Sequence, residues 1–453
     1  MVLAAQPLGD HLPLWSAAPF VGLLVAVSVL ELTAQRWWSG LANKAIVVGI
    51  AAALAGAYLV AGFGSAGGSA LLHSLTDYTS FLVLLTALFV VAGGIEVKGS
   101  LSGTPLANTA MLGIGAVLAN LIGTTGAAMV LIRPYLRANA RRTHKAHLVV
   151  FFILIVANAG GLLTPLGDPP LYLGFLKGVP FGWTLNLWLP WLFVNGVVLF
   201  VFNLVDQFVV NREEGLKRTE GLLDELLVHE RLRVLGLRNL VFLVGAVAVI
   251  LARGSGVGTA GQPWSFGIQE VLLGAIAAGS YVLTPRGIHE RNHFSFRPMA
   301  AVAVVFFGIF VTMTSPLLLL NARSDELGLS APWQYFWASG SLSAMLDNAP
   351  TYLSFTAVAA GEAGLSTHDP LYLAALLGVD GGAVLLAAIS CGAVFMGCLT
   401  YIGNGPNLMV KEMAEHRGIR MPNFFAYAAV AALVMVPIFV ATTFIFFAPG
   451  AGR

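Results

Sequence analysis

Residues 157–170 read ANAGGLLTPLGDPP and directly follow the apolar run LVVFFILIV at 148–156. Three glycines, three prolines and one carboxylate, Asp168, interrupt a segment whose composition suits lipid. Glycine permits sharp turns, and proline ends a helix without leaving an unpaired donor. The stretch therefore predicts a helix that breaks in the middle of a membrane.

The composition supports a membrane location. Of 453 residues, 57% are hydrophobic and only 10% are charged, whereas soluble domains carry about 25% charged residues. Because a lipid-facing backbone must satisfy its own hydrogen bonds, we predict an all-α polytopic membrane protein, multi-pass in the inner (plasma) membrane. The net charge of +2 suggests no nucleic-acid partner. The N-terminus lacks a basic stretch, so we expect no cleavable signal peptide.

A span needs about 20 apolar residues. We predict about ten spans, two of them broken, at 14–32, 42–62, 78–95, 147–177, 183–209, 238–252, 267–284, 298–318, 370–410 and 424–447. Two further apolar stretches, 101–132 and 333–360, carry helix breakers near their middles and are expected to be re-entrant hairpins.

The distribution of basic residues tests this layout. With the N-terminus outside, 20 of the 24 Lys and Arg residues fall on the cytoplasmic side and four on the outer side. This agrees with the positive-inside rule. A single crossing at either hairpin would invert every segment after it.

The same layout divides the chain into two inverted repeats, 1–210 and 238–453, joined by a cytoplasmic linker at 211–237. GLLTPLGDPP (161–170) aligns with GCLTYIGNGP (397–406) at five of ten positions. The hairpins contain ANLIGTTG (119–126) and LDNAPTY (346–352). Inverted repeats with broken helices are typical of transporters that bind their substrate near the middle of the membrane.

The breaks gather oxygen-bearing side chains, which suit a hard cation such as sodium. In the first half we expect a cluster of Asn120, Thr124, Thr125, Asn158, Thr164 and Asp168. In the second half we expect a cluster of Asp347, Asn348, Thr351, Thr400, Asn404 and Asn407. These twelve residues are the candidate site for sodium and protons, with sodium as a transported or coupling ion and no other cofactor.

Ionisable residues within spans are costly and point to function. Asp168 and Asp347 lie at the breaks, and their alternative role is to cap a helix. We expect interfacial roles for Glu96, Asp206 and Glu270, and polar packing within a span for Asp380. Arg133 is expected to anchor its helix at the membrane surface, or else to bind an anionic substrate. Cys391 and Cys398 are expected to pack in the core.

At these residues the chain resembles the ion transporter superfamily, in particular NhaD-type sodium/proton antiporters and their citrate-transporter-like relatives. ANAGGLLTPLGD is similar to the Asn-Ala-Gly-Gly…Pro-Ile-Gly-Asp loop of that group, and LDNAP is similar to its Asp-Asn hairpin signature. The resemblance implies a homodimer with a scaffold domain and an elevator-like transport domain that carries the hairpins. It also implies ion-site roles for Asp168, Asp347, Asn158 and Asn348.

Two functions follow, and neither is enzymatic. The first is a secondary sodium (cation)/proton antiporter in which Asp168 and Asp347 bind the competing ions. None of the nine histidines lies in mid-span, so the proton carrier is expected to be a carboxylate. The alternative is a cation-coupled transporter for citrate or another carboxylate anion. A membrane receptor or scaffold would not need paired breaks.

Overall fold

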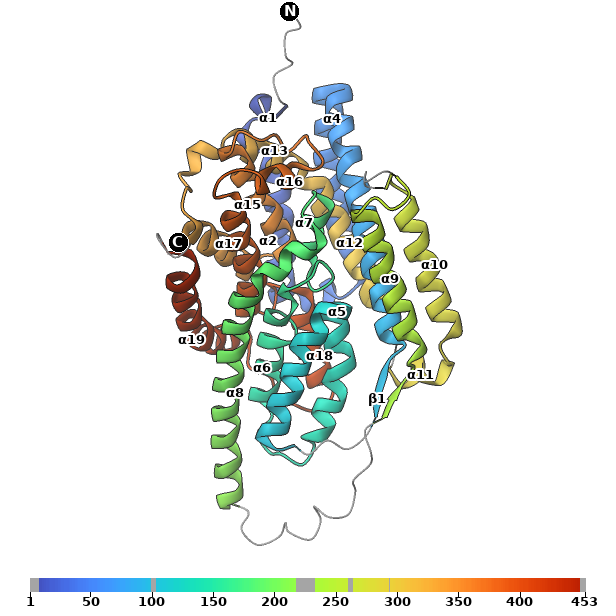
Figure 1. Cartoon of the computed structure of the whole chain (residues 1–453), viewed down its shortest axis with the longest axis vertical. Coiled ribbons are helices and arrows are strands. Elements are labelled where there is room, and N and C mark those ends of the chain that lie inside the picture. Colours follow the sequence, from blue (N-terminus) through green and yellow to red (C-terminus); the bar gives the residue numbers. More distant parts are fainter. Residues whose placement is uncertain (1–7, 99–102, 217–232, 260–263, 293, 449–453) are drawn as a thin grey trace, which may run out of the picture.

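A computed structural model describes residues 8–98, 103–216, 233–259, 264–292 and 294–448 (Figure 1). The all-α polytopic fold predicted from the sequence is confirmed. Five of the described helices are long and apolar enough to cross a membrane, or six if the bent pair α12 and α13 forms one span. Shorter apolar helices and helices interrupted by breaks account for the remaining predicted spans.

The main helices of the first half are α2 (Ala18–Thr33), α4 (Leu41–Gly93), α5 (Pro105–Ala138), α6 (Ala146–Ile155), α7 (Pro169–Leu176) and α8 (Trp188–Leu216). Those of the second half are α9 (Arg238–Gly254), α10 (Ile268–Leu283), α12 (Arg297–Thr312), α13 (Thr314–Ala322), α14 (Pro332–Met345), α15 (Asn348–Glu362), α17 (Gly382–Met396), α18 (Gly405–Glu415) and α19 (Phe424–Thr442).

Short elements complete the fold. They are α1 (Leu8–His11), α3 (Gln35–Trp38), α11 (Arg286–Arg291) and α16 (Tyr372–Leu377), the 3₁₀ segments Leu14–Ala17, Ala159–Leu162, Phe181–Leu187, Ser324–Leu327 and Gly397–Leu399, and a π-helical turn at Thr443–Phe447. The antiparallel strands β1 (Glu96–Lys98) and β2 (Arg233–Leu235) pair Val97 with Val234. The sequence analysis did not predict this small sheet.

Helix α4 contains two of the predicted spans. Its backbone leaves the helical conformation at Gly64, where φ is +56°. A Cβ added to Gly56 would lie 3.7 Å from Leu71, so the two arms run back along each other. The predicted loop between the spans 42–62 and 78–95 is therefore shorter than expected, because residues 65–77 are helical.

Both predicted hairpins are present. Helix α5 reverses at Gly123, and Asn108 near its start exchanges hydrogen bonds with Asn139 at its C-cap, at 3.0 and 2.8 Å. In the second half, α14 and α15 pack together and are separated only by residues 346–347. Each hairpin brings its turn to the middle of the protein.

The two broken spans repeat with one spacing. Helices begin at Ala146 and Gly382, at Pro169 and Gly405, and at Trp188 and Phe424, and each pair is 236 residues apart. This spacing supports the division into two inverted repeats, which stays a prediction. Residues 217–232 of the predicted linker 211–237 lie outside the described residues.

One expected placement is wrong. The last broken span begins at Gly382 rather than near residue 370, because a short helix and a turn precede it. Asp380 lies in that turn and is exposed, so it does not pack within a span.

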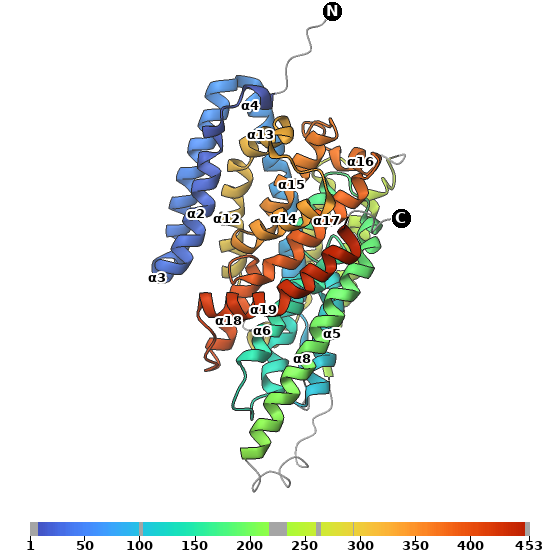
Figure 2. The same cartoon turned by 90° about the vertical axis from the view of Figure 1, so that its left-hand side faces the viewer.

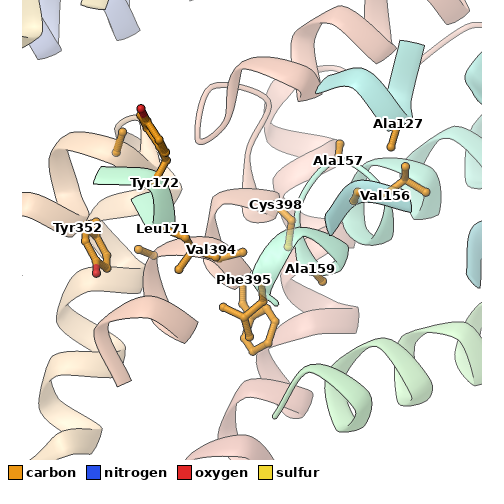
Figure 3. Packing of buried hydrophobic residues seen from close by; sticks show 14 of the residues in the cluster. Ala127, Val156, Ala157, Ala159, Leu171, Tyr172, Tyr352, Val394, Phe395 and Cys398 are labelled. Atoms are coloured by element: carbon orange, nitrogen blue, oxygen red, sulfur yellow. The ribbon is translucent and has the colours of Figure 1, made fainter. Parts of the chain in front are cut away.

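Helices α2, α9, α10 and α12 pack around α4, and we call these five helices the frame (Figures 1 and 2). The hairpins and broken spans form the rest of the core, which we call the break unit: α5, α6, α7, α14, α15, α17 and α18. Figure 3 shows its apolar packing, in which Cys398 lies near Phe395 and Ala159. Cys391 and Cys398 are both buried free thiols, as expected for packing residues.

Candidate functional site

Asp168 lies where the breaks meet. It is the N-cap residue of α7, but its carboxylate accepts no hydrogen bond from that helix. Instead, Thr124 Oγ1 donates to Oδ1 at 3.0 Å and Asn404 Nδ2 donates to Oδ1 at 3.2 Å. Asn348 Nδ2 donates to Oδ2. Asp168 is only 1% exposed, so neutral side chains replace water around the carboxylate.

These donors come from both halves of the chain. Thr124 begins the second arm of α5, Asn348 begins α15, and Asn404 is the N-cap residue of α18. The sequence analysis expected one cluster in each half. The structure joins them at Asp168, because the two hairpin turns and the two breaks converge at one place.

A chain of amides extends from this point. Asn404 Nδ2 donates to Asn158 Oδ1 at 3.3 Å, and Asn158 Nδ2 donates to Asn407 Oδ1 at 2.7 Å. Asn407 Nδ2 in turn donates to the carbonyls of Gly397 and Thr400, at 3.0 and 2.9 Å. The amides thus pair the break of the first half with the break of the second.

Other candidates hold the hairpins against the breaks. Asn120 Nδ2 donates to the Gly160 carbonyl at 2.7 Å, and Thr164 Oγ1 donates to the Asn120 carbonyl. In the second half, Thr400 Oγ1 makes the equivalent bond to the Ala344 carbonyl at 2.5 Å. Since these polar atoms already have protein partners, their observed role is to position the turns.

Asp347 differs from Asp168. It is the N-cap residue of α15, and its Oδ1 accepts a hydrogen bond from Ala349 N at 3.2 Å. Thr351 Oγ1 donates back to the Asp347 carbonyl at 3.1 Å, so it stabilises the same helix turn. Thr125 is half-buried and borders the cavity described next.

A cavity of about 90 Å³ lies beside Asp168. Its polar wall comes from the break unit, and its apolar wall comes from α4 and α12 of the frame. The polar lining consists of Thr124, Thr125, Asp168, Tyr172, Asp347 and Asn404, and the apolar lining includes Leu84, Leu88, Met299 and Phe306. None of the described lining residues is Lys, Arg or His.

Four helix N-termini point to this cavity. They belong to α7, α15, α18 and the second arm of α5, each of which contributes its first residues or its cap to the lining. A helix N-terminus carries a partial positive charge from the aligned peptide dipoles. The cavity therefore combines two carboxylates with four positive helix ends.

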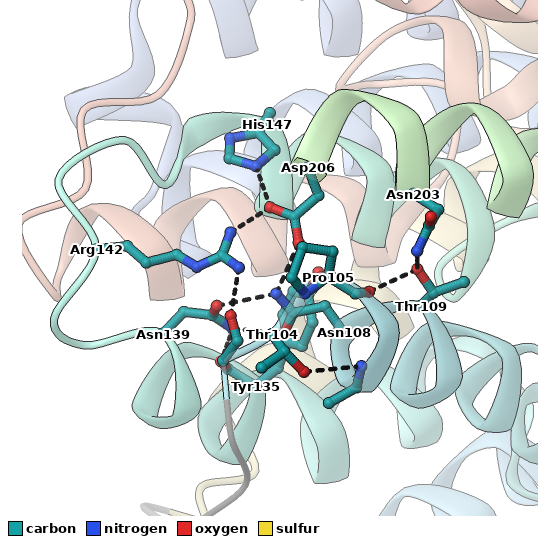
Figure 4. A network of polar contacts seen from close by, with 12 residues as sticks. Thr104, Pro105, Asn108, Thr109, Tyr135, Asn139, Arg142, His147, Asn203 and Asp206 are labelled. Carbon is teal, nitrogen blue, oxygen red and sulfur yellow. Dashed lines mark hydrogen bonds and ion pairs between the residues drawn. The ribbon is translucent and has the colours of Figure 1, made fainter. Parts of the chain in front are cut away.

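The sequence analysis missed a buried network at the base of the first hairpin (Figure 4). Asp206 of α8 accepts hydrogen bonds from Asn108 at 2.9 Å and from Arg142, and it lies 2.9 Å from His147 Nε2. Asn139 joins the network through Asn108. No local signal in the sequence indicated this network, because Arg142 and His147 lie 64 and 59 positions before Asp206.

The other ionisable candidates have their own surroundings. Glu96 pairs with Arg291 at 2.8 Å, and Glu270 accepts a hydrogen bond from Ser80 at 2.5 Å. Both carboxylates are buried within the protein, although they lie near helix ends. Arg133 is half-buried, and its buried Nη1 has no partner among the described residues.

Comparison with protein families places the chain. A family model described as "Putative citrate transport" matches residues 9–447, which is nearly the whole chain. Among curated proteins, none matches this sequence.

Proposed function

The chain belongs to this citrate-transport family, and we propose that it carries citrate or a related carboxylate across the plasma membrane together with a cation. Membership of this family supports a secondary membrane transporter. We therefore favour carboxylate transport, the alternative function inferred from the sequence, over cation/proton exchange, the first one.

The observation that carries the proposal is the cavity beside Asp168. Four helix N-termini border it and supply positive potential for a carboxylate substrate. Asp168 and Asp347 supply negative charge for a cation. An anion and a cation bound together would partly neutralise each other in a site shielded from water, which is a physical basis for coupled transport.

A second candidate is sodium/proton antiport. It is favoured by the two carboxylates of the lining and by the lack of Lys, Arg or His among the described lining residues. Protons and sodium would then compete for Asp168. This function needs no organic substrate.

In either case the site must face the two sides of the membrane in turn. The cavity lies between the frame and the break unit, so we propose that the break unit moves against the frame as the transport domain of an elevator. By the family resemblance, the protein would form a homodimer, and the frame would be its scaffold domain.

Transport by the purified protein in proteoliposomes would test the proposal. Labelled citrate uptake and internal pH are followed under inward gradients of Na⁺, Li⁺ or K⁺. A carboxylate carrier takes up citrate faster with its coupling cation, and that cation moves no protons without citrate. Sodium-driven proton movement without citrate, and no citrate uptake, would instead establish the antiporter.

A further inference from the structure

Helix α7 connects the site to the frame. Asp168 occupies its N-cap position, Tyr172 lies one turn further along, and Lys177 is its C-cap residue. Both Tyr172 and Lys177 contact α4 or α10, which provide none of the three donors to Asp168. We call this contact the α7 seam: Tyr172 and Lys177 of the break unit against Asp77, Ser80, Gln269 and Glu270 of the frame.

The seam is polar and buried. Gln269 Nε2 donates to Tyr172 Oη at 2.7 Å, and Tyr172 Oη lies 3.4 Å from the Ser80 carbonyl. Ser80 Oγ donates to Glu270 at 2.5 Å. Lys177 forms an ion pair with Asp77, and the two side chains are only 9% and 17% exposed. Water is therefore largely excluded from these contacts.

The seam and the cavity occupy different levels of the frame. Along α4, the seam residues Asp77 and Ser80 precede the cavity residues Leu84 and Leu88. The seam thus lies toward the Gly64 turn, which we call the Gly64 side. The cavity lies toward the end of the protein where α8 and β2 meet the linker, which we call the linker side (Figure 1).

We propose that the α7 seam is the gate that closes the site on the Gly64 side and that it opens once in each transport cycle. This rests on the proposed transport function. For the site to reach the Gly64 side, α7 must leave α4 and α10, and the Lys177–Asp77 and Tyr172–Gln269 contacts must break.

The chemistry of the seam suits a contact that opens. Its groups are polar, so water can replace each broken bond, whereas a separated apolar seam would expose hydrocarbon. At the seam, the buried Gln269 Oε1 has no hydrogen-bond partner among the described residues, and beside the seam Arg253 Nη1 forms an ion pair with Glu270 but no hydrogen bond. Arg253 lies 3.6 Å from Glu270. These atoms would gain partners when water enters.

The first test weakens the seam and needs no substrate. Gln269→Leu removes the donor to Tyr172, and Thr125→Cys reports access to the cavity through a membrane-impermeant thiol reagent. We expect labelling from the Gly64 side to rise about three- to tenfold, the range that one neutral hydrogen bond supports. Ser74→Ala is the matched control, because Ser74 on α4 bonds Thr314 of α13, outside the seam, at 2.9 Å. An unchanged rate in Gln269→Leu overturns the gate.

The second test locks the seam. Asp77→Cys with Lys177→Cys is joined by a short bis-methanethiosulfonate cross-linker in proteoliposomes. We expect citrate uptake to be lost and to return when a reductant removes the linker. The control pair is Tyr78→Cys with Ala303→Cys, which joins α4 to α12 within the frame and should carry on transporting when cross-linked.

The two tests separate the gate from the proposed function. Full uptake through the cross-linked Asp77–Lys177 pair would overturn the gate. Lack of uptake by the wild-type protein would overturn the carboxylate proposal, while the labelling experiment would still decide about the gate.

Discussion

Asp168 and Asp347 both occupy the N-cap position of a helix, yet only Asp347 caps. Its carboxylate accepts the Ala349 N–H, whereas the Asp168 carboxylate is held by Thr124, Asn348 and Asn404. The Asp168 side chain therefore makes no hydrogen bond to its own helix that would explain its presence. A buried carboxylate is costly, so its retention at the meeting point of four helix ends favours a role in binding.

Asp168→Asn is expected to abolish coupled transport while the protein still folds. Asparagine keeps the shape but removes the charge, and its amide group faces three donors where only acceptors fit. Without the carboxylate charge, the site loses the electrostatic attraction for a cation, which is strong where water is excluded. Cation-stimulated uptake and thermal stability are measured together, and normal uptake at normal yield would show that Asp168 is not the cation site.

Asp347 provides the contrast at the same scale. Asparagine is as good an N-cap residue as aspartate, so Asp347→Asn should keep the stability of α15. Asp347→Ala should destabilise the protein by about 0.5–2 kcal/mol. Thermal unfolding in detergent distinguishes them. Equal stability of the two variants would contradict the capping role.

The hairpin turn of α5 is the element that positions Thr124. At Gly123 the backbone has φ +77° and ψ 156°, a conformation open almost only to glycine. A Cβ there would also lie 3.2 Å from the Leu166 carbonyl in the opposing break. The turn and the break are thus fitted to each other, and Thr124 N confirms the contact by donating to the Gly167 carbonyl at 2.8 Å.

Gly123→Ala is expected to destabilise the protein by about 1–3 kcal/mol and to weaken cation-stimulated uptake, because the strained turn moves Thr124. Gly113→Ala is the matched control on the same helix. Its added Cβ would meet only Leu199 at 3.6 Å, and alanine is the better helix former. Uptake and thermal unfolding of both variants are compared. Similar losses of uptake and stability in both variants would mean that α5 tolerates no added methyl group at either position, and that the conformation of the turn is not the cause.

At this scale, the sequence predicts which breaks and hairpins form better than it predicts which residues they contact. Glycine and proline mark the breaks and hairpins, because they act on the local backbone. The joining of Thr124 and Asn348 at one carboxylate depends on how distant elements pack, which no local pattern encodes. For the same reason the α7 seam and the Asp206 network were missed, since each requires side chains about 60–190 positions apart to meet.

At the scale of the whole molecule, charge and architecture agree. Hairpin α5 enters from the linker side and hairpin α14–α15 from the Gly64 side (Figures 1 and 2). Inverted repeats require this opposite entry. Arg142 at the base of the first hairpin and Arg291 beside Glu96 lie with the predicted cytoplasmic set. The linker side is therefore expected to face the cytoplasm.

Cysteine labelling in intact cells tests this orientation. Asn211→Cys lies at the start of the linker, and Ser65→Cys lies beside the Gly64 turn; both positions are exposed. Cys391 and Cys398 are fully buried and should not react with the labelling reagent. Because 20 of 24 basic residues lie on the linker side in the predicted topology, inserting them outward would oppose the positive-inside rule. A membrane-impermeant maleimide should thus label Ser65→Cys in intact cells and Asn211→Cys only after permeabilisation. The reverse pattern would place the cavity toward the outside and the α7 seam toward the cytoplasm, so the gate would close the opposite face of the membrane.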